Sequence, residues 1–466
     1  MTPLLARTIG AARRWVTRRT LVVGAILAAG FGLFLLYAFP GYMSSDSITQ
    51  LVEGRNGNRG DWHPPAMAAL WGLVDRVVAG PAGMLILQGA TFLAGCYRIL
   101  RKDLPPPAAA IAASALLVFP PVLAPMAVIW KDCQMAGLLA LGISLVDDPR
   151  RARWLAGVGL LAVASAMRDN APVATLAIFL FVFAPARARR WRARIAIGVV
   201  AWVATLALAM TTNKLLTQVE QHAWHTSLGP SDIIGIIKQR SLDYSDGELR
   251  ELLEGTPLIA TDDLRKHAAR IYSTRSWWYY MVGEDRMFDW PVNDEQRAAI
   301  KRAWKTLVSD RPRAYAFHRL AVFRELIGLS GQPVFDPVWA ACISIADDGT
   351  VSETPPRASQ AAIRDAMLWL ARKTPLFRPW IYLLLAFALV PLAWRRHVVP
   401  LLASGILYEL TLLPFAPSPD YRYSHWLVIC TLLAAIRIAA SWVARRRDKS
   451  NLPGYPAPPP QSKVRE

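Results

Sequence analysis

The sequence predicts an all-α polytopic membrane protein. Its 466 residues are 54% hydrophobic, with a mean hydropathy of +0.26, which is too apolar for an ordinary soluble protein. Several apolar runs approach the roughly 20 residues that a helix needs to cross a bilayer. The 18 Trp and 34 Pro agree with this class, because aromatic residues gather at membrane interfaces and proline is tolerated in spanning helices.

We expect about ten transmembrane helices. The first is an uncleaved span rather than a signal peptide, because its apolar run is longer than a typical signal core and no A-x-A site follows it. The ten predicted spans are Leu21–Ala38, Gly83–Leu100, Ala108–Val128, Cys133–Val146, Trp154–Met167, Pro172–Ala184, Ile195–Met210, Leu376–Trp394, Val398–Phe415 and Trp426–Val443.

The distribution of positive charge predicts the orientation of these spans. The chain has 53 Lys and Arg against 34 Asp and Glu, a net charge of +19. The basic clusters fall at alternate span ends, as is typical of cytoplasmic loops, so no nucleic-acid partner is expected and both termini are predicted to be cytoplasmic. These clusters are Arg14–Arg19, Arg98–Lys102, Arg150–Arg153, Arg187–Arg194, Arg395–Arg396 and Arg445–Arg447.

This orientation divides the chain into four parts. Residues 1–212 form an N-terminal membrane core, whose first outer loop, 40–80, carries an active-site region. Residues 213–374 form a helical periplasmic domain, 375–444 the C-terminal transmembrane helices, and 445–466 a Pro-rich disordered cytoplasmic tail. Within the first loop, Ile48, Leu51 and Val52, and then Met67, Leu70 and Trp71, keep helical spacing. They predict two short juxtamembrane helices.

The unusual polar segments all fall on the outer side. They are "GYMSSDSITQLVEGRNGNRGDWHPP" from Gly41, "WKD" from Trp130, "RDN" from Arg168 and "PDYRYSH" from Pro419. We expect them to converge on one site. In the first segment, Asp46 is either a helix N-cap or a carboxylate that removes a proton or holds a metal, and Ser44 or Ser45 can cap instead.

Each remaining candidate also has a structural alternative. His63 is either a packed interfacial residue or a catalytic or ligand-contacting one, and Asp46, Asp61 and His63 show no recognised metal-ligand spacing. Lys131 and Asp132 are an interfacial anchor beside Trp130 or part of a site. Arg168 and Asn170 belong to a tight turn or to the same site. Arg422 lies between Tyr421 and Tyr423. Outer-face cations among aromatic residues suit a lipid-linked phosphate or pyrophosphate.

The sequence has no Walker loop, GxSxG, HExxH or GxGxxG motif. An enzyme at an outer membrane face therefore needs a substrate that arrives already activated. A sugar linked to a polyprenyl phosphate meets that requirement.

The motifs "SSDS…Q…WHPP", "KD", "RDN" and "RY" together resemble the GT-C superfamily of polytopic glycosyltransferases, which use polyprenyl-phosphate-linked sugars. The resemblance implies that Asp46 acts as the base and that Lys131, Arg168 and Arg422 contact the donor phosphate. It places His63 in the catalytic region and Asp132, Asn170, Tyr421 and Tyr423 in support. Asp61 or Asp132 is the candidate second acid of a metal-dependent relative, so a divalent metal ion stays open as a cofactor.

The sequence therefore predicts hexosyl or pentosyl transfer at the periplasmic face of a bacterial inner membrane. The expected partners are a polyprenyl-phosphate-linked sugar donor, membrane lipids, and a cell-envelope glycan or lipid acceptor. A lipid-linked glycan ligase or polymerase is the first alternative. A flippase, which would show repeat symmetry and charges midway through its spans, is the second, and a non-catalytic assembly protein is the third.

Overall fold

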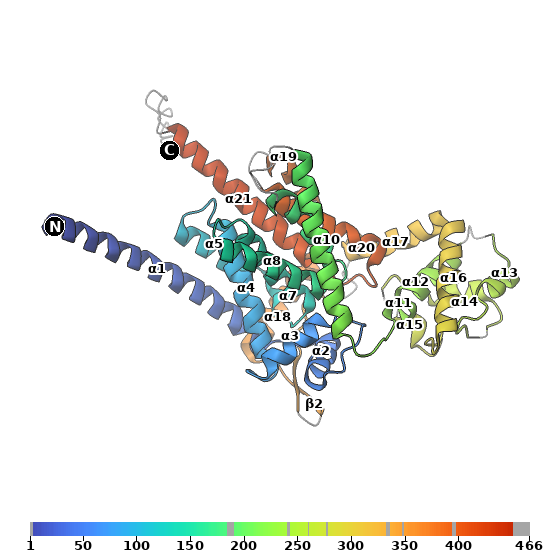
Figure 1. Ribbon diagram of the computed structural model, residues 1–466. Helices are drawn as coiled ribbons and strands as arrows, with labels where there is room; N and C mark the ends of the chain where they lie inside the picture. Colours follow the sequence, from blue (N-terminus) through green and yellow to red (C-terminus); the bar gives the residue numbers. More distant parts are fainter. Residues whose placement is uncertain are drawn as a thin grey trace, which may run out of the picture.

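The computed structural model describes residues 3–183, 191–239, 243–259, 261–275, 278–331, 336–346, 349–393 and 398–450. Part of one predicted basic cluster, 187–190, and the whole of another, 395–396, lie outside the described residues, as does 451–466 of the predicted tail. The described chain is mainly helical, with both termini on one side of the molecule and the region of α11 to α16 on the other (Figure 1).

A helix or a helix pair overlaps every predicted span. They are α1 (Pro3–Ala38), α4 (Ala82–Leu100), α5 (Pro106–Val118) with α6 (Pro120–Met126), α7 (Lys131–Val146), α8 (Arg151–Met167), α9 (Ala171–Ile178), α10 (Trp191–Leu216), α19 (Pro379–Ala393), α20 (Val399–Phe415) and α21 (His425–Ser450). Helix α21 includes residues 445–450, which the sequence assigned to a disordered tail.

Four helices among the described residues are long and apolar enough to cross a membrane, or five if the bent pair α5 and α6 counts as one span. The chain is therefore a membrane protein with several spans, and the expected number of ten is not confirmed. Helices α9, α19 and α20 are apolar but short, and α7 is largely buried inside the protein. A helix that is buried inside a protein is also apolar, so apolar composition alone does not show that a helix faces lipid.

The predicted third span, Ala108–Val128, is not one straight helix. Helices α5 and α6 meet at 66°. Phe119, between them, is extended, with φ −67° and ψ 125°. The cause is local, because Pro120 sterically disfavours the helical conformation at the residue before it, Phe119. The bend carries the chain back towards the first loop before α7 begins.

Helix α7 lies at the centre of the bundle and packs against α4 and α8. Gly95 permits the α4 contact, since a Cβ atom there would lie 2.4 Å from the backbone nitrogen of Leu141. Small residues at such crossings let membrane helices approach closely. The rigid core thus fixes the N-terminal end of α7, where Lys131 lies.

The two predicted first-loop helices are present as α2 (Ser45–Asn56) and α3 (Ala66–Asp75). They touch backbone to backbone, because a Cβ atom at Gly72 would lie 2.2 Å from the carbonyl oxygen of Gly54. Their placement along a membrane surface stays a prediction.

The predicted outer domain contributes to two cores. Helices α11 (Ala223–Thr226), α12 (Leu228–Ile237), α13 (Asp246–Leu252), α14 (Leu264–Ile271), α15 (Trp278–Met281), α16 (Asp294–Asp310) and α17 (Pro312–Leu326) come first along the chain. Buried residues of this region, including Ile233, Leu249 and Ile300, form a separate core. Val338, Ile345 and Met367, in contrast, belong to the core of the membrane region.

The chain is not entirely α-helical. Strands β1 (Cys342–Ile345) and β2 (Val351–Thr354) form an antiparallel hairpin in which Cys342 faces Thr354 and Ile345 faces Val351. Helix α18 (Ala358–Lys373) follows. These strands were not predicted, because four-residue segments give little alternation to detect in a sequence.

Candidate active site

Backbone pairing brings the first loop to the start of α7. Tyr42 donates its N–H to Ala127 and accepts from Ile129, each bond measuring 2.9 Å. Ser47 Oγ donates to the carbonyl of Ile129 at 2.9 Å, and Trp130 Nε1 donates to Ser44 Oγ at 2.8 Å. Two segments far apart in the sequence are therefore fixed side by side.

The N-cap of α2 is Ser44. Its backbone N–H donates to Ser47 Oγ at 3.0 Å, which closes the first turn of the helix. Asp46 is therefore not required as the cap, and its carboxylate is available to the site.

A cavity of about 680 Å³ opens where the polar segments meet. Its wall contains seven of the residues singled out in the sequence: Asp46, His63, Lys131, Arg168, Asn170, Arg422 and Tyr423. Four separate regions supply them: α2 with its following loop, α7, the turn after α8, and the segment before α21. The polar segments thus converge at one end of the helical bundle.

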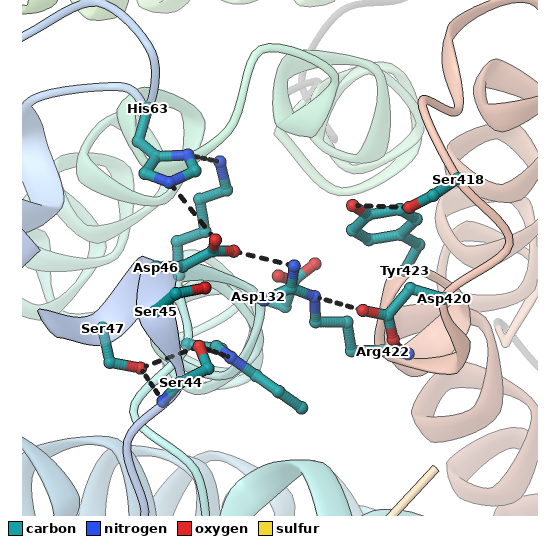
Figure 2. A network of polar contacts seen from close by, with 12 residues as sticks. Ser44, Ser45, Asp46, Ser47, His63, Asp132, Ser418, Asp420, Arg422 and Tyr423 are labelled. Atoms are coloured by element: carbon teal, nitrogen blue, oxygen red, sulfur yellow. Dashed lines mark hydrogen bonds and ion pairs between the residues drawn. The ribbon is translucent and has the colours of Figure 1, made fainter. Parts of the chain in front are cut away.

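Asp46 lies between two basic side chains (Figure 2). Its Oδ2 is 2.7 Å from Nη2 of Arg422, and its Oδ1 is 3.6 Å from Nε2 of His63. Burial alone raises the pKa of Asp46, but Arg422, His63 and Lys131 outweigh it and hold that pKa well below its usual range. Asp46 is a carboxylate at neutral pH, and a weak base while Arg422 is bound to it.

His63 connects Asp46 to Lys131. Its Nδ1 is 2.9 Å from Lys131 Nζ. Burial first, and then the positive charge of Lys131, lower the pKa of His63, so the ring is neutral at pH 7. When Lys131 donates to Nδ1, the hydrogen must reside on Nε2, which faces Asp46. Nδ1 then accepts a hydrogen bond from Lys131, while Nε2 lies 3.6 Å from Asp46 Oδ1, and the catalytic role of His63 stays a prediction.

Arg168 forms a buried ion pair with Asp132, whose side chain is only 1% exposed. Its guanidinium carbon also lies 4.6 Å from the ring centre of Tyr423. Asp132 is behind Arg168 and is not part of the cavity wall. Its role in the structure is to hold Arg168 in place.

Arg422 is fixed on three sides. Its Nε lies 2.9 Å from Asp420, its Nη2 contacts Asp46, and its guanidinium carbon is 4.7 Å from the ring centre of Trp130. Asp420 and Trp130 were not proposed as site residues from the sequence. Asp420 lies in the "PDYRYSH" segment and Trp130 in the "WKD" segment. Their closeness in sequence to Arg422 and Lys131 was the only feature that could have identified them as site residues.

Three other candidates have mainly structural contacts. Tyr421 is not in the cavity wall, and its hydroxyl donates to the carbonyl of Pro121 at 3.0 Å. Asp61 accepts from the backbone N–H of His222 at 3.1 Å, which joins the first loop to the segment before α11. Asn170 reaches the cavity wall and donates to Thr411 Oγ1 at 2.9 Å.

The side chains of the site show whether they could hold a divalent metal ion. No group of three or more His, Cys, Asp or Glu side chains that could hold a metal is found within the described part of the chain. Between Asp46 and Asp420 lies the Arg422 guanidinium, so a fixed cation already occupies the space between the two carboxylates. The described donor set therefore does not fit a divalent metal at this point.

Part of the cavity wall is apolar. Val173, Leu412 and Phe415 line it, and Phe415 is 62% exposed. The cavity therefore combines cationic groups with an apolar side on α9 and α20. Trp62 and Trp224 form a further aromatic part of the wall.

Comparison with known proteins gives one weak likeness. No family model matches the chain, and no curated protein does. Among solved structures, ArnT from Cupriavidus metallidurans in the apo state is similar over 96% of this chain and 82% of that chain, at 15% identity and a TM-score of 0.33. A TM-score of that size establishes neither a shared fold nor a shared activity.

Proposed function

We propose that this protein is a membrane glycosyltransferase of the GT-C type. It transfers a sugar from a polyprenyl-phosphate donor to a cell-envelope glycan or lipid acceptor at the periplasmic face of a bacterial inner membrane, with both termini in the cytoplasm. The observation that carries the proposal is the cavity in which Lys131, Arg168 and Arg422 meet Asp46 beside an apolar wall.

The cationic groups support an anionic donor. A guanidinium binds phosphate through two parallel N–H groups, and an ammonium adds a point charge. Desolvating positive side chains is costly unless an anion compensates them, and burial lowers the pKa of Lys131 to about 7. Carboxylates compensate two of them in the unliganded protein, through the Arg168–Asp132 and Arg422–Asp46 pairs. A lipid phosphate would take over part of that compensation.

The apolar wall supports a lipid tail on the same donor. Exposed Phe415 and the neighbouring Leu412 and Val173 offer a path for a polyprenyl chain from the bilayer to the cations. A free phosphate or a soluble nucleotide would make no use of that surface.

The chemistry then requires one base and an anion-stabilising group. Asp46 takes the proton of an acceptor hydroxyl, whose oxygen attacks the anomeric carbon of the sugar. The bond from that carbon to the phosphate oxygen breaks, and Arg422 and Arg168 stabilise the departing phosphate. A single displacement of this kind inverts the anomeric configuration. Trp62 and Trp224 line the same cavity and are proposed to contact an acceptor sugar.

The test is transfer by the purified protein in lipid vesicles. A polyprenyl-phosphate hexose or pentose should be consumed, and mass spectrometry of co-purifying lipids should detect such a donor. Consumption of a pyrophosphate-linked glycan instead would favour the ligase or polymerase. Movement of the lipid across the bilayer without sugar transfer would overturn the proposal.

A further inference from the structure

We propose that Trp130 is a positioning residue for this reaction: it holds Arg422 in place while the guanidinium exchanges Asp46 for the phosphate of the donor. The inference rests on the proposed function and extends it to a residue outside the set of charged groups. The contacts of Trp130, Arg422 and Asp46 support it.

Trp130 supports Arg422 through its ring face. The guanidinium carbon lies 4.7 Å from the centre of the Trp130 ring and 5.3 Å from that of Tyr423. Cation–π contacts of this kind are stronger when water is excluded, and Trp130 is only 7% exposed. The ring holds the cation without using any of its N–H groups, so those groups remain available to anions.

Trp130 also fixes the partner of Arg422. Its Nε1 donates to Ser44 Oγ at 2.8 Å, and Ser44 is the N-cap of α2, two residues before Asp46. One indole therefore sets the positions of both members of the Asp46–Arg422 pair.

The pair itself can open. Asp420 keeps hold of Arg422, since it accepts the backbone N–H of Arg422 at 3.1 Å while its other oxygen lies 2.9 Å from Nε (Figure 2). Asp46 has a second partner, His63, at 3.6 Å, which is longer than a hydrogen bond. A phosphate that takes Nη2 would let Asp46 close that gap.

The exchange of Asp46 for phosphate at Arg422 sets the order of the reaction steps. While Asp46 is bound to Arg422, it is a poor proton acceptor. Once phosphate occupies Arg422, the carboxylate is free to take the proton from the acceptor hydroxyl. The acceptor oxygen then bonds to the anomeric carbon, and the donor phosphate leaves with the electron pair of the broken bond.

The experiment measures binding of a methyl phosphodiester of a short-chain polyprenol, which keeps a single negative charge from acidic to alkaline pH. Trp130→Leu should weaken binding about tenfold, because it removes the aromatic face. Trp130→Phe keeps a ring face and should stay within about threefold of the wild-type protein. Asp46→Asn should bind more tightly, since the phosphate no longer displaces a charged carboxylate.

Trp71→Leu is the matched control. Trp71 is fully buried in α3, and its Nε1 donates to the carbonyl of Gly80 at 3.1 Å, so its loss perturbs packing without removing a contact to Arg422. It should bind the probe like the wild type.

Wild-type affinity in Trp130→Leu, or equal losses in Trp130→Leu, Trp130→Phe and Trp71→Leu, would overturn the positioning role. Unchanged affinity in Asp46→Asn would overturn the exchange. A wild-type protein that fails to bind the probe would overturn the proposed donor class, and this inference with it.

Discussion

Asp46 and Arg422 form an ion pair, with 2.7 Å between Oδ2 and Nη2, at the wall of the cavity. The group proposed to accept a proton is thus bound to a group proposed to receive phosphate. This relationship explains why the site can be stable when it is empty, because each charge compensates the other. It also links the two proposed substrates, because the phosphate of the donor must bind Arg422 before Asp46 is free to take a proton from the acceptor.

Replacing Asp46 by Asn should reduce sugar transfer by about 10³-fold, the size expected for loss of a positioned base. The amide cannot accept the hydroxyl proton, while the cations that bind the donor remain. The initial rate of transfer from a polyprenyl-phosphate sugar checks this. Glu295→Gln, on the exposed first turn of α16, is the control and should remain active. Normal turnover in Asp46→Asn would refute the base assignment.

His63→Gln should reduce the sensitivity of the fold to mild acid. The folded-state pKa of His63 lies below its ordinary value of 6.5, so the unfolded chain binds more protons as the pH falls below that value, and wild-type stability declines. Glutamine can donate to Asp46 and accept from Lys131 without titrating. The thermal midpoint should therefore fall less in the variant than in the wild type between pH 7.5 and about 5.

The low pKa of Asp46 gives a dependence of the same sign, but its stabilisation is lost only as the pH falls below about 4, outside that interval. An identical acid dependence in wild type and His63→Gln would contradict the assignment of a neutral His63.

Arg168→Ala should destabilise the protein by about 3–5 kcal/mol, because it leaves the buried Asp132 carboxylate without its counter-charge. The double variant Arg168→Ala with Asp132→Ala removes both charges and should recover much of the lost thermal midpoint. It should not recover donor binding, since Arg168 belongs to the cavity wall. Recovery of both properties would mean that Arg168 is only structural.

Gly72→Ala should lower stability by about 1–3 kcal/mol and reduce transfer. The new Cβ atom would lie 2.2 Å from the Gly54 carbonyl, so α2 and α3 must separate and Asp46 must shift relative to His63. Gly24→Ala in α1 is the matched control, because nothing lies within 4 Å of the added atom. It should leave the thermal midpoint unchanged or raise it slightly. Equal effects of the two substitutions would show that the α2–α3 contact is not needed.

Local sequence patterns were sufficient for much of the fold. Apolar runs located the helices of the bundle, and the helical spacing of apolar residues after Asp46 and after Pro65 located α2 and α3. Helix α13 also begins at a local signal, because Ser245 Oγ accepts from the backbone N–H of Glu248 at 3.2 Å. The break between α5 and α6 was not predicted, because proline is often tolerated in spanning helices and Pro120 and Pro121 therefore gave no clear signal.

The sequence by itself therefore determined a helical membrane chain and the polar segments from which a site could be built. Only the tertiary structure decided which charges are paired. Asp46 with Arg422, Arg168 with Asp132, and Trp130 beneath Arg422 are contacts between residues on different elements. A carboxylate next to a guanidinium differs chemically from a free one, and that proximity depends on how the helices pack, which no local pattern records.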